Sequence, residues 1–262
     1  MEKISLITVC YNSSATIRET LDSVLSQDYP NIEYIVLDGG SNDGTQEIIK
    51  EYADRISVFK SEKDKGLYDA MNKAIDLTTG SIVGILNSDD LYFDSSIISR
   101  VMREFEGADV ACVFGDLTYF KTGEEHKVVR TYNGSHFKPQ WLKFGILPPH
   151  PTFFVRRTAY EKYGKFDLQF RYAADFDLMA RFLYVNSLPY KYLPITMVRM
   201  RLGGISTGSL SRIVDINKEA LASCRKNGIK TNFFLFHFKY LWKLLQVKSF
   251  SALINKKEKE KQ

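Results

Sequence analysis

The first hundred residues alternate between short apolar runs and longer segments with helical spacing. The apolar runs predict strands at 4–9, 32–37, 56–59 and 81–86, and the amphipathic segments predict helices at 14–27, 45–53, 67–77 and 95–105. Short strands that alternate with helices are typical of βαβ units and a parallel sheet. Right-handed crossovers then bring the carboxyl ends of the strands to one edge, where open α/β sheets bind their ligands. We therefore expect an α/β protein with its site at this edge.

Each predicted strand is followed by a polar segment. These segments are 10–13 (Cys-Tyr-Asn-Ser), 38–44, 62–66 and 87–90 (Asn-Ser-Asp-Asp). One such loop would be ordinary turn chemistry, because Asp, Asn, Gly and Ser are preferred in turns. Four of them at the same sheet edge indicate a binding site.

The second half of the chain has a less regular pattern. It predicts strands at 110–114, 126–131 and 192–201, helices at 158–163 and 174–184, and a proline-containing loop at 138–151. Periodicity alone does not assign a role to this mixed half. We expect it to bind a second ligand beside the site of the first half.

Composition and charge narrow the class of protein. A chain of 262 residues that is 44% hydrophobic forms one large domain or two closely packed halves. Residues 225–262 carry ten Lys and Arg against two Asp and Glu, whereas residues 1–224 carry 26 against 29. Because the body is slightly acidic, we do not expect a nucleic-acid surface.

The cysteines and the N-terminal residues indicate the cellular compartment in which we expect the protein. Cys10, Cys112 and Cys224 are far apart, without metal-binding or paired spacing, and fit a reducing environment. The first apolar run is also shorter than the apolar region of a secretory signal. We therefore expect a cytoplasmic location.

Asp89 and Asp90 are the sharpest chemical feature, because they adjoin at the end of an apolar strand. Adjacent carboxylates repel, and a divalent cation would offset this repulsion. Mn²⁺ or Mg²⁺ is commonly held by one or two carboxylates together with substrate phosphates. The alternative is that Asp90 only caps the following helix.

Five segments, in order along the chain, resemble the family 2 glycosyltransferases. They are 5–12 (Ser-Leu-Ile-Thr-Val-Cys-Tyr-Asn), 36–45 (Val-Leu-Asp-Gly-Gly-Ser-Asn-Asp-Gly-Thr), 65–74, 87–90 and 173–178 (Ala-Ala-Asp-Phe-Asp-Leu). The resemblance implies a GT-A fold, which is a Rossmann-like, mostly parallel sheet flanked by helices, over 1–206. Residues 1–105 would form the nucleotide-sugar half, 106–206 the acceptor half, and 207–262 a C-terminal helical extension.

The resemblance also implies a reaction and a site. The reaction is inverting transfer of a sugar from a nucleoside diphosphate, with uridine the expected nucleoside, to a hydroxyl of a glycan or lipid-linked acceptor. It places Tyr11, Asp38 and Asp89 at the nucleotide, Asp90 on the metal, and Asp175 as the base that deprotonates the acceptor hydroxyl. Residues two apart on a helix point about 200° apart, so only one of Asp175 and Asp177 can face a cleft. The alternative for Asp175 is a helix cap.

The sequence departs from the family pattern at two positions. Gly39 stands where many members have a second aspartate, and Met71 stands where members often have an arginine. Lys65 would then supply a cation to a phosphate as a flexible point charge. Asp69 and Asn72 share one helix face and are expected to line the donor sugar.

Two later residues complete the predicted site. His150, between prolines in 148–154, resembles the histidine segment beside the acceptor site, although a loop histidine is often only solvent-exposed. Arg201 with 203–206 resembles a flexible loop that closes over donor phosphates, and its alternative is a plain surface turn.

Residues 204–208 also match the Gly-x-Ser-x-Gly elbow of hydrolases, but we regard this match as chance because the strand and helix context is missing.

The tail at 232–254 is rich in aromatic and basic residues, which predicts a helix lying in a membrane interface. Its lysines argue against a spanning helix. Two alternatives remain for this segment, which are a strand and a helix docked on the body of the protein. Interface binding would fit assembly of a cell-surface polysaccharide at the inner face of a membrane.

A second hypothesis for the whole chain is a non-catalytic sugar-nucleotide or glycan-binding module. The presence of Asp90 and Asp175 disfavours this hypothesis, because such a module would be expected to lose them.

Overall fold

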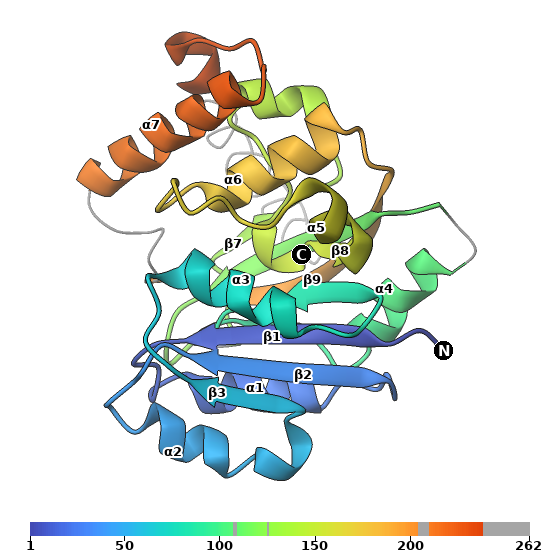
Figure 1. Cartoon of the computed structure of the whole chain (residues 1–262), viewed down its shortest axis with the longest axis vertical. Helices are drawn as coiled ribbons and strands as arrows, with labels where there is room; N and C mark the ends of the chain where they lie inside the picture. Colours follow the sequence, from blue (N-terminus) through green and yellow to red (C-terminus); the bar gives the residue numbers. More distant parts are fainter. Residues whose placement is uncertain (107–108, 125, 204–209, 238–262) are drawn as a thin grey trace, which may run out of the picture.

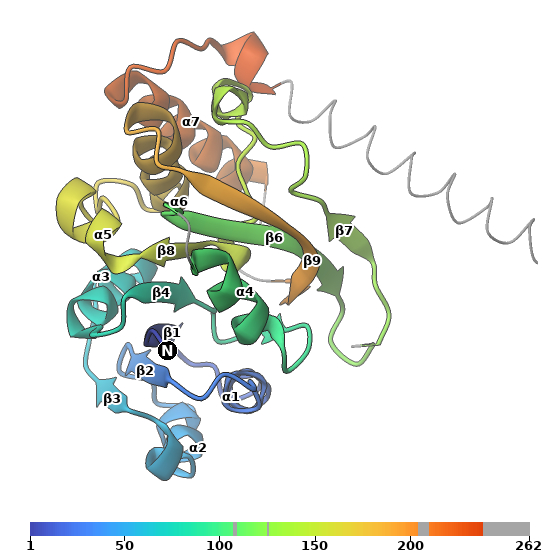
Figure 2. The same cartoon turned by 90° about the vertical axis from the view of Figure 1, so that its right-hand side faces the viewer.

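The computed structural model describes residues 1–106, 109–124, 126–203 and 210–237 of the chain. A single mixed sheet runs through the molecule in the order β3-β2-β1-β4-β8-β6-β9-β5, and β7 pairs with β6 (Figure 1). Helices cover both faces of this sheet. Figure 2 shows α3 and α5 on one side of the strands and α1 and α4 on the other.

The first half forms the predicted βαβ units. The strands are β1 (Ile4–Cys10), β2 (Ile32–Asp38), β3 (Val58–Ser61) and β4 (Ile82–Ile85), and all of their mutual pairings are parallel. The helices are α1 (Ile17–Leu25), α2 (Thr45–Lys50), η1 (Ala53–Arg55), α3 (Leu67–Leu77) and α4 (Ile97–Phe105). Every residue of β1 is buried, as expected for a central parallel strand with helices on both faces.

The second half adds strands of both directions. They are β5 (Leu91–Tyr92), β6 (Cys112–Phe120), β7 (Arg130–Tyr132), β8 (Phe154–Arg156) and β9 (Tyr190–Arg201). β6 and β9 are parallel, whereas β4–β8, β6–β8, β6–β7 and β5–β9 are antiparallel. The sheet is therefore parallel in its first half and mixed in its second. β5 and β8 were not predicted, because two or three residues are too short to show a period.

In the second half, the structure differs from the prediction in the loop and in one of the two helices. Residues 138–151 contain two 3₁₀ turns, η2 (Pro139–Phe144) and η3 (His150–Thr152), each with a proline at its start. α5 (Arg157–Tyr163) is close to the prediction. The predicted helix at 174–184 is α6 (Ala174–Met179) followed by a π-helical turn, η4 (Ala180–Val185). α7 (Leu210–Lys226) forms most of the described part of the C-terminal extension, which continues to residue 237.

Glycine at position 84 allows the two halves to pack closely. A Cβ at Gly84 of β4 would lie 2.4 Å from a ring carbon of Phe154 on β8, which no real contact permits. Phe154 is 1% exposed at this junction. The absence of a side chain at 84 therefore lets β8 join the parallel strands to β6.

The hydrophobic core crosses the boundaries expected from the sequence. One cluster of buried residues includes Ile7 of β1, Cys112 of β6, and Ala220 and Cys224 of α7. The three proposed regions, 1–105, 106–206 and 207–262, thus share one sheet or one core where the structure describes them. Within the described ranges, the helices are too short or too polar to cross a membrane.

Candidate active site

Asp38 ends β2, and its carboxylate organises the loop that follows. Asp38 Oδ2 accepts hydrogen bonds from the backbone N–H groups of Gly40 (3.1 Å) and Ser41 (2.9 Å) and from Ser61 Oγ (2.6 Å). The residue is only 2% exposed. Contact of Asp38 with a nucleotide therefore stays a prediction, because several protein donors already bind this carboxylate.

Tyr11 and Asp64 lie on either side of Gly39. Tyr11 is 64% exposed at the end of β1. A Cβ at Gly39 would lie 3.3 Å from Tyr11 Cδ2 and 2.5 Å from Asp64 Oδ2. Asp64 comes from the loop before α3, and it occupies the space that an aspartate at position 39 would need. Asp64 was predicted only as one member of the polar segment 62–66, and the unusual glycine at position 39 was the signal for its individual role.

Asp90 is buried beside Arg201 at the carboxyl ends of β4 and β9. Asp90 is 1% exposed, and its Oδ1 accepts the backbone N–H of Arg201 at 3.2 Å. Burial raises the pKa of Asp90 well above its usual range, and the charge of Asp89 adds to this effect. Burial likewise raises the pKa of Asp89. The capping alternative for Asp90 is wrong, because α4 begins at Ile97 after the N-cap Ser96.

Arg201 is a buried cation on the donor side rather than part of a surface turn. It is 7% exposed, and its Nη2 lies 2.6 Å from Glu19 Oε2. Its Nε donates to the backbone carbonyl of Asp89 at 3.4 Å. Arg201 thus lies at the Asp89–Asp90 pair, and its contact with donor phosphates stays a prediction. The loop at 204–206 and the Gly-x-Ser-x-Gly stretch at 204–208 lie outside the described residues.

A cavity of about 1,070 Å³ opens between α3, the 145–151 loop, α6 and α7. Lys65, Asp69 and Asn87 line it from the donor half, and His150 and Asp175 line it from the second half. Asp90 and Arg201 are not among the described residues that line this cavity, but Asn87 and Met200, close to them in sequence, are. The structure therefore brings the predicted base together with donor-side residues.

Asn72 is not among the described cavity residues, and its predicted role is corrected. Its Nδ2 donates to the carbonyl of Phe166 at 2.8 Å, and its Oδ1 accepts the N–H of Phe166 at 2.9 Å. Both polar ends of the amide are therefore used to hold the 165–173 segment. Asp69 remains at the cavity, where it accepts the backbone N–H of Lys65 at 3.0 Å.

Asp175 and Asp177 point to different environments, as helix geometry requires. Asp175 lines the cavity, and its Oδ1 accepts a hydrogen bond from the hydroxyl of Tyr68 at 3.2 Å. Asp177 is fully buried, and its carboxylate binds Arg181 Nε at 2.9 Å and Ser223 Oγ at 2.9 Å. Asp175 lies one residue inside α6 rather than at its N-cap, which is Ala173. Of the two carboxylates, only Asp175 is placed to meet a substrate.

His150 lies at the same cavity in a turn fixed by prolines. Burial lowers the pKa of its imidazole, and the negative charge of Asp175 opposes that effect. The His150 ring contacts Phe166 edge-on at a centroid distance of 6.1 Å. The expectation of a loop histidine exposed to solvent is therefore not met.

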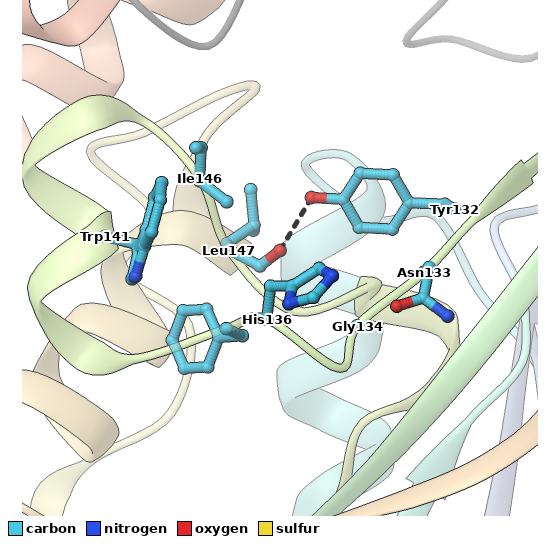
Figure 3. A pocket seen from close by; sticks show the side chains of 8 residues that line it. Tyr132, Asn133, Gly134, His136, Trp141, Ile146 and Leu147 are labelled. Carbon is cyan, nitrogen blue, oxygen red and sulfur yellow. Dashed lines mark hydrogen bonds between the residues drawn. The ribbon is translucent and has the colours of Figure 1, made fainter. Parts of the chain in front are cut away.

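A second, small pocket of about 20 Å³ lies behind the 145–151 loop and has room for about one water molecule. Figure 3 shows Tyr132 reaching across this pocket to the loop. The Tyr132 hydroxyl donates to the carbonyl of Leu147 at 2.8 Å. Because Tyr132 and Leu147 also line the large cavity, this bond fixes part of its wall.

The far end of the cavity is formed by α7 and the segment before α6. Ile213, Ile216 and Ala220 of α7 line it, together with Arg171 and Arg212. This wall combines apolar and cationic side chains. This wall could not be predicted from the sequence, because α7 carries no motif.

The first described residues of the tail dock on the body. Phe236 is fully buried, and its ring meets Phe176 of α6 at a centroid distance of 5.9 Å. Phe233 and Phe234 are 62% and 84% exposed. The remainder of the predicted interface segment, 238–254, lies outside the described residues.

A mixed sheet that is parallel in its first half, has helices on both faces and carries Asp38, Asp89 and Asp90 beyond its carboxyl edge is the arrangement of a GT-A glycosyltransferase. More narrowly, the chain belongs to glycosyl transferase family 2, because residues 5–164 match that family's model. The predicted family and fold class are confirmed. They rest on this match and on the structural likenesses given below.

Two curated relatives illustrate the family. The "PGL/p-HBAD biosynthesis glycosyltransferase" of Mycobacterium bovis (strain BCG / Pasteur 1173P2) is 29% identical over 212 residues, which cover 77% of this chain and 78% of the relative. The "UDP-Glc:alpha-D-GlcNAc-diphosphoundecaprenol beta-1,3-glucosyltransferase WfaP" of Escherichia coli is 38% identical over 102 residues, 38% of this chain and 41% of the relative.

Solved structures share the fold. S. aureus TarS 1–349 in complex with UDP-GlcNAc has a TM-score of 0.65 at 16% identity, covering 84% of this chain and 66% of that one. The mannosyltransferase PcManGT from Pyrobaculum calidifontis, in complex with GDP-Man and Mn²⁺, has a TM-score of 0.59 at 17% identity, covering 94% and 81%. This chain thus spans slightly less than two thirds of the TarS fragment. At these identities the likeness shows the fold.

Proposed function

We propose that the protein is a metal-dependent, inverting glycosyltransferase that moves a sugar from a UDP-sugar to a hydroxyl of a lipid-linked glycan. One observation carries this proposal: Asp175 and the donor-side residues Lys65, Asp69 and Asn87 line a single cavity. A base and a donor that share one cavity can hold an acceptor hydroxyl between them. Such positioning supplies a large part of the rate enhancement of a two-substrate reaction.

Asp175 would act as the general base. Its Oδ1 accepts a hydrogen bond from Tyr68, which leaves the second carboxylate oxygen to take the proton of the attacking hydroxyl. The hydroxyl oxygen would attack the anomeric carbon from the face opposite the nucleoside diphosphate, so the configuration inverts. His150 stands at the same cavity, and its burial favours the neutral imidazole, which can bind an acceptor hydroxyl.

The residues at the end of β4 fit a divalent cation. Among the described residues, the buried side-chain oxygens without a hydrogen-bond partner are Asn87 Oδ1 and Asp90 Oδ2. The described chain holds no group of three or more His, Cys, Asp or Glu that could bind a metal alone. Asp90 and its neighbour Asp89 would therefore hold Mn²⁺ or Mg²⁺ together with donor phosphates. When bound, such an ion stabilises negative charge on the leaving diphosphate.

The nucleotide would lie at the ends of β1 and β2. Tyr11 offers an exposed ring for stacking on the base, and Asp64 offers a carboxylate beside it. The Asp38 loop would border the ribose, and Lys65 would approach a phosphate. UDP is the proposed carrier, because the names of WfaP and of the TarS complex specify UDP-sugars.

The acceptor would enter from the α7 end of the cavity. Its apolar wall suits a lipid chain, and Arg171 and Arg212 suit a phosphate or diphosphate. The name of WfaP specifies a diphosphoundecaprenol acceptor, which has both chemistries. Exposed Phe233 and Phe234 would support peripheral contact of the tail with the inner face of a membrane.

The test is transfer by the full-length protein from UDP-glucose or UDP-N-acetylglucosamine to α-GlcNAc-diphosphoundecaprenol in detergent, with and without Mn²⁺. Asp175→Asn should abolish transfer and leave UDP affinity within about twofold, because the base acts only in the transition state. Saturable UDP-sugar binding without turnover across donors and acceptors would instead favour the binding-module hypothesis. A wild-type rate that Asp175→Asn does not lower would reassign the base.

A further inference from the structure

The three residues before α6 share one acidic partner from α7. The backbone N–H of Arg171 donates to Glu219 Oε1 at 3.1 Å, and those of Tyr172 and Ala173 donate to Glu219 Oε2 at 2.7 and 3.0 Å. Hydrogen bonds that end on a carboxylate are stronger than those between neutral groups. Glu219 therefore holds three successive peptide groups at the start of the helix that carries Asp175.

The start of α6 has no side-chain cap from its own N-cap residue. Ala173 is the N-cap of α6 and has no polar side chain that could bind the first amides. Its carbonyl accepts the N–H of Asp177 at 3.0 Å, which is the first bond of the helix. The position of Ala173 thus fixes the start of the helix, and Asp175 follows two residues later.

A side chain of α3 also contacts this segment. The Tyr68 hydroxyl lies 3.2 Å from the carbonyl oxygen of Tyr172 and 3.2 Å from Asp175 Oδ1. The single hydroxyl proton of Tyr68 is shared between these two acceptors, whereas the N–H of Tyr172 is bound by Glu219. Removing either contact would allow the segment to shift along the cavity.

The C-terminal end of α7 is joined to α6 at a second place. Ser223 Oγ and Asn227 Nδ2 bind the buried Asp177 carboxylate at 2.9 and 2.8 Å, and Cys224 is fully buried. Glu219 lies one turn before Ser223 on the same helix. The two helices are therefore joined at Glu219 and again at Asp177, on either side of Asp175 in the sequence.

We propose that Glu219 is a positioning residue for the Asp175 carboxylate. This role rests on the proposed function, and it belongs to a helix beyond the family match at 5–164. Glu219 acts through the backbone of 171–173, so it should affect the catalytic step and not the binding of the nucleotide. A shift of about 1 Å at a catalytic group can lower the rate by up to a hundredfold.

The experiment compares Glu219→Ala and Glu219→Gln in the full-length protein, with Asp215→Ala as the matched control. Asp215 lies on the same helix and pairs with Lys218 at 3.7 Å. The measurements are kcat in the transfer assay above, the Kd of UDP with Mn²⁺, and hydrogen exchange of the amides at 171–173. Glu219→Gln keeps one accepting oxygen, which preserves a folded variant if Glu219→Ala does not fold.

We expect Glu219→Ala to lower kcat about tenfold, Glu219→Gln to lower it less, and both to leave the Kd of UDP within about twofold. Exchange at 171–173 should accelerate in both variants and remain unchanged in Asp215→Ala. Faster exchange with unchanged kcat would overturn the proposal, and so would unchanged exchange in Glu219→Ala. If the wild-type protein shows no transfer activity, the proposed function is overturned. This result is obtained before any variant is compared, so it is distinct from a failure of the Glu219 proposal.

Discussion

The hydroxyl of Tyr68 donates a hydrogen bond to Asp175 Oδ1 at 3.2 Å, across 107 positions of sequence. Tyr68 belongs to α3 in the first half of the chain, and Asp175 belongs to α6 in the second. Burial raises the pKa of Tyr68 well above its usual range, and the charge of Asp175 adds to this effect. The phenol therefore stays protonated and remains a donor to the carboxylate under ordinary conditions.

Tyr68→Phe should lower kcat about three- to tenfold and leave the Kd of UDP unchanged. The variant loses the bond that orients Asp175 but keeps the ring, which stacks on Phe166 at 5.2 Å. One buried hydrogen bond contributes about 1 kcal/mol, which corresponds to a change of this size. Transfer kinetics and calorimetry measure the two quantities. Tyr163→Phe is the control, and equal effects of both variants would contradict the prediction.

Asp177→Ala should destabilise the fold by about 3 kcal/mol, because it leaves the largely buried Arg181 guanidinium without its carboxylate. Urea denaturation measures this loss as a lower midpoint. The remaining folded protein should still catalyse transfer. Asp175→Asn should show the reverse pattern, with little loss of stability and no transfer. A stable but inactive Asp177→Ala protein would mean that the two carboxylates have been assigned the wrong way round.

His150 should make stability depend on pH. Because its pKa is lower in the folded protein, the unfolded chain binds more protons just below its ordinary pKa of 6.5. Stability is therefore complete above that pH and is lost as the pH falls below it. Thermal melts from pH 7.5 to pH 5 should show a smaller loss in His150→Gln than in the wild type. His126→Gln, at an exposed position, should follow the wild type.

Asp90→Asn should remove the stabilisation that Mn²⁺ and UDP give together. The wild type gains about 2.7 kcal/mol at a ligand concentration one hundred times Kd. Without Mn²⁺ the variant should melt no lower than the wild type at pH 7.5, because burial disfavours the ionised Asp90 carboxylate. Melting curves with UDP and either Mn²⁺ or a chelator test both statements. Asp109→Asn, at an exposed position, is the control, and a full Mn²⁺ response in Asp90→Asn would refute the assignment.

Arg171→Gln combined with Arg212→Gln should raise KM for the diphospholipid acceptor about tenfold, because charge-assisted hydrogen bonds to a phosphate are worth about 1.5–3 kcal/mol. The UDP-sugar KM should not change. Added salt should weaken acceptor binding less in the double variant than in the wild type. Arg225→Gln, at the end of α7, is the matched control. An unchanged acceptor KM would place the lipid phosphate elsewhere.

The donor half could be predicted because its signals are local. α3 runs over Leu67–Leu77, the range that its spacing predicts, since an amphipathic helix of three turns reveals its period. The same method missed β8 and β5, which have too few residues to show a pattern. The strand predicted at 110–114 also ends earlier than β6. Gly115 and Asp116 interrupt the apolar run there, at the place where β6 has an irregular register with β9.

The site could be predicted only as far as single residues carry a signal. Helix geometry allows only one of Asp175 and Asp177 to face a cleft, and the family resemblance selects Asp175; the structure places Asp175 at the cavity and buries Asp177. Asp64 beside Gly39, and Glu219 beside the start of α6, depend on contacts between segments far apart in the sequence. Asn72 looked suitable by its helix face, but its partner Phe166 lies 94 positions away.

The binding of the 171–173 segment by α7 has a consequence for engineering. A chimera that exchanges the C-terminal helix to recruit a different lipid would also exchange the support of the catalytic carboxylate. If α7 has both proposed roles, acceptor choice and turnover would be coupled through this helix. A successful transplant must bring an acidic side chain at the position of Glu219, together with a hydroxyl one turn later for Asp177.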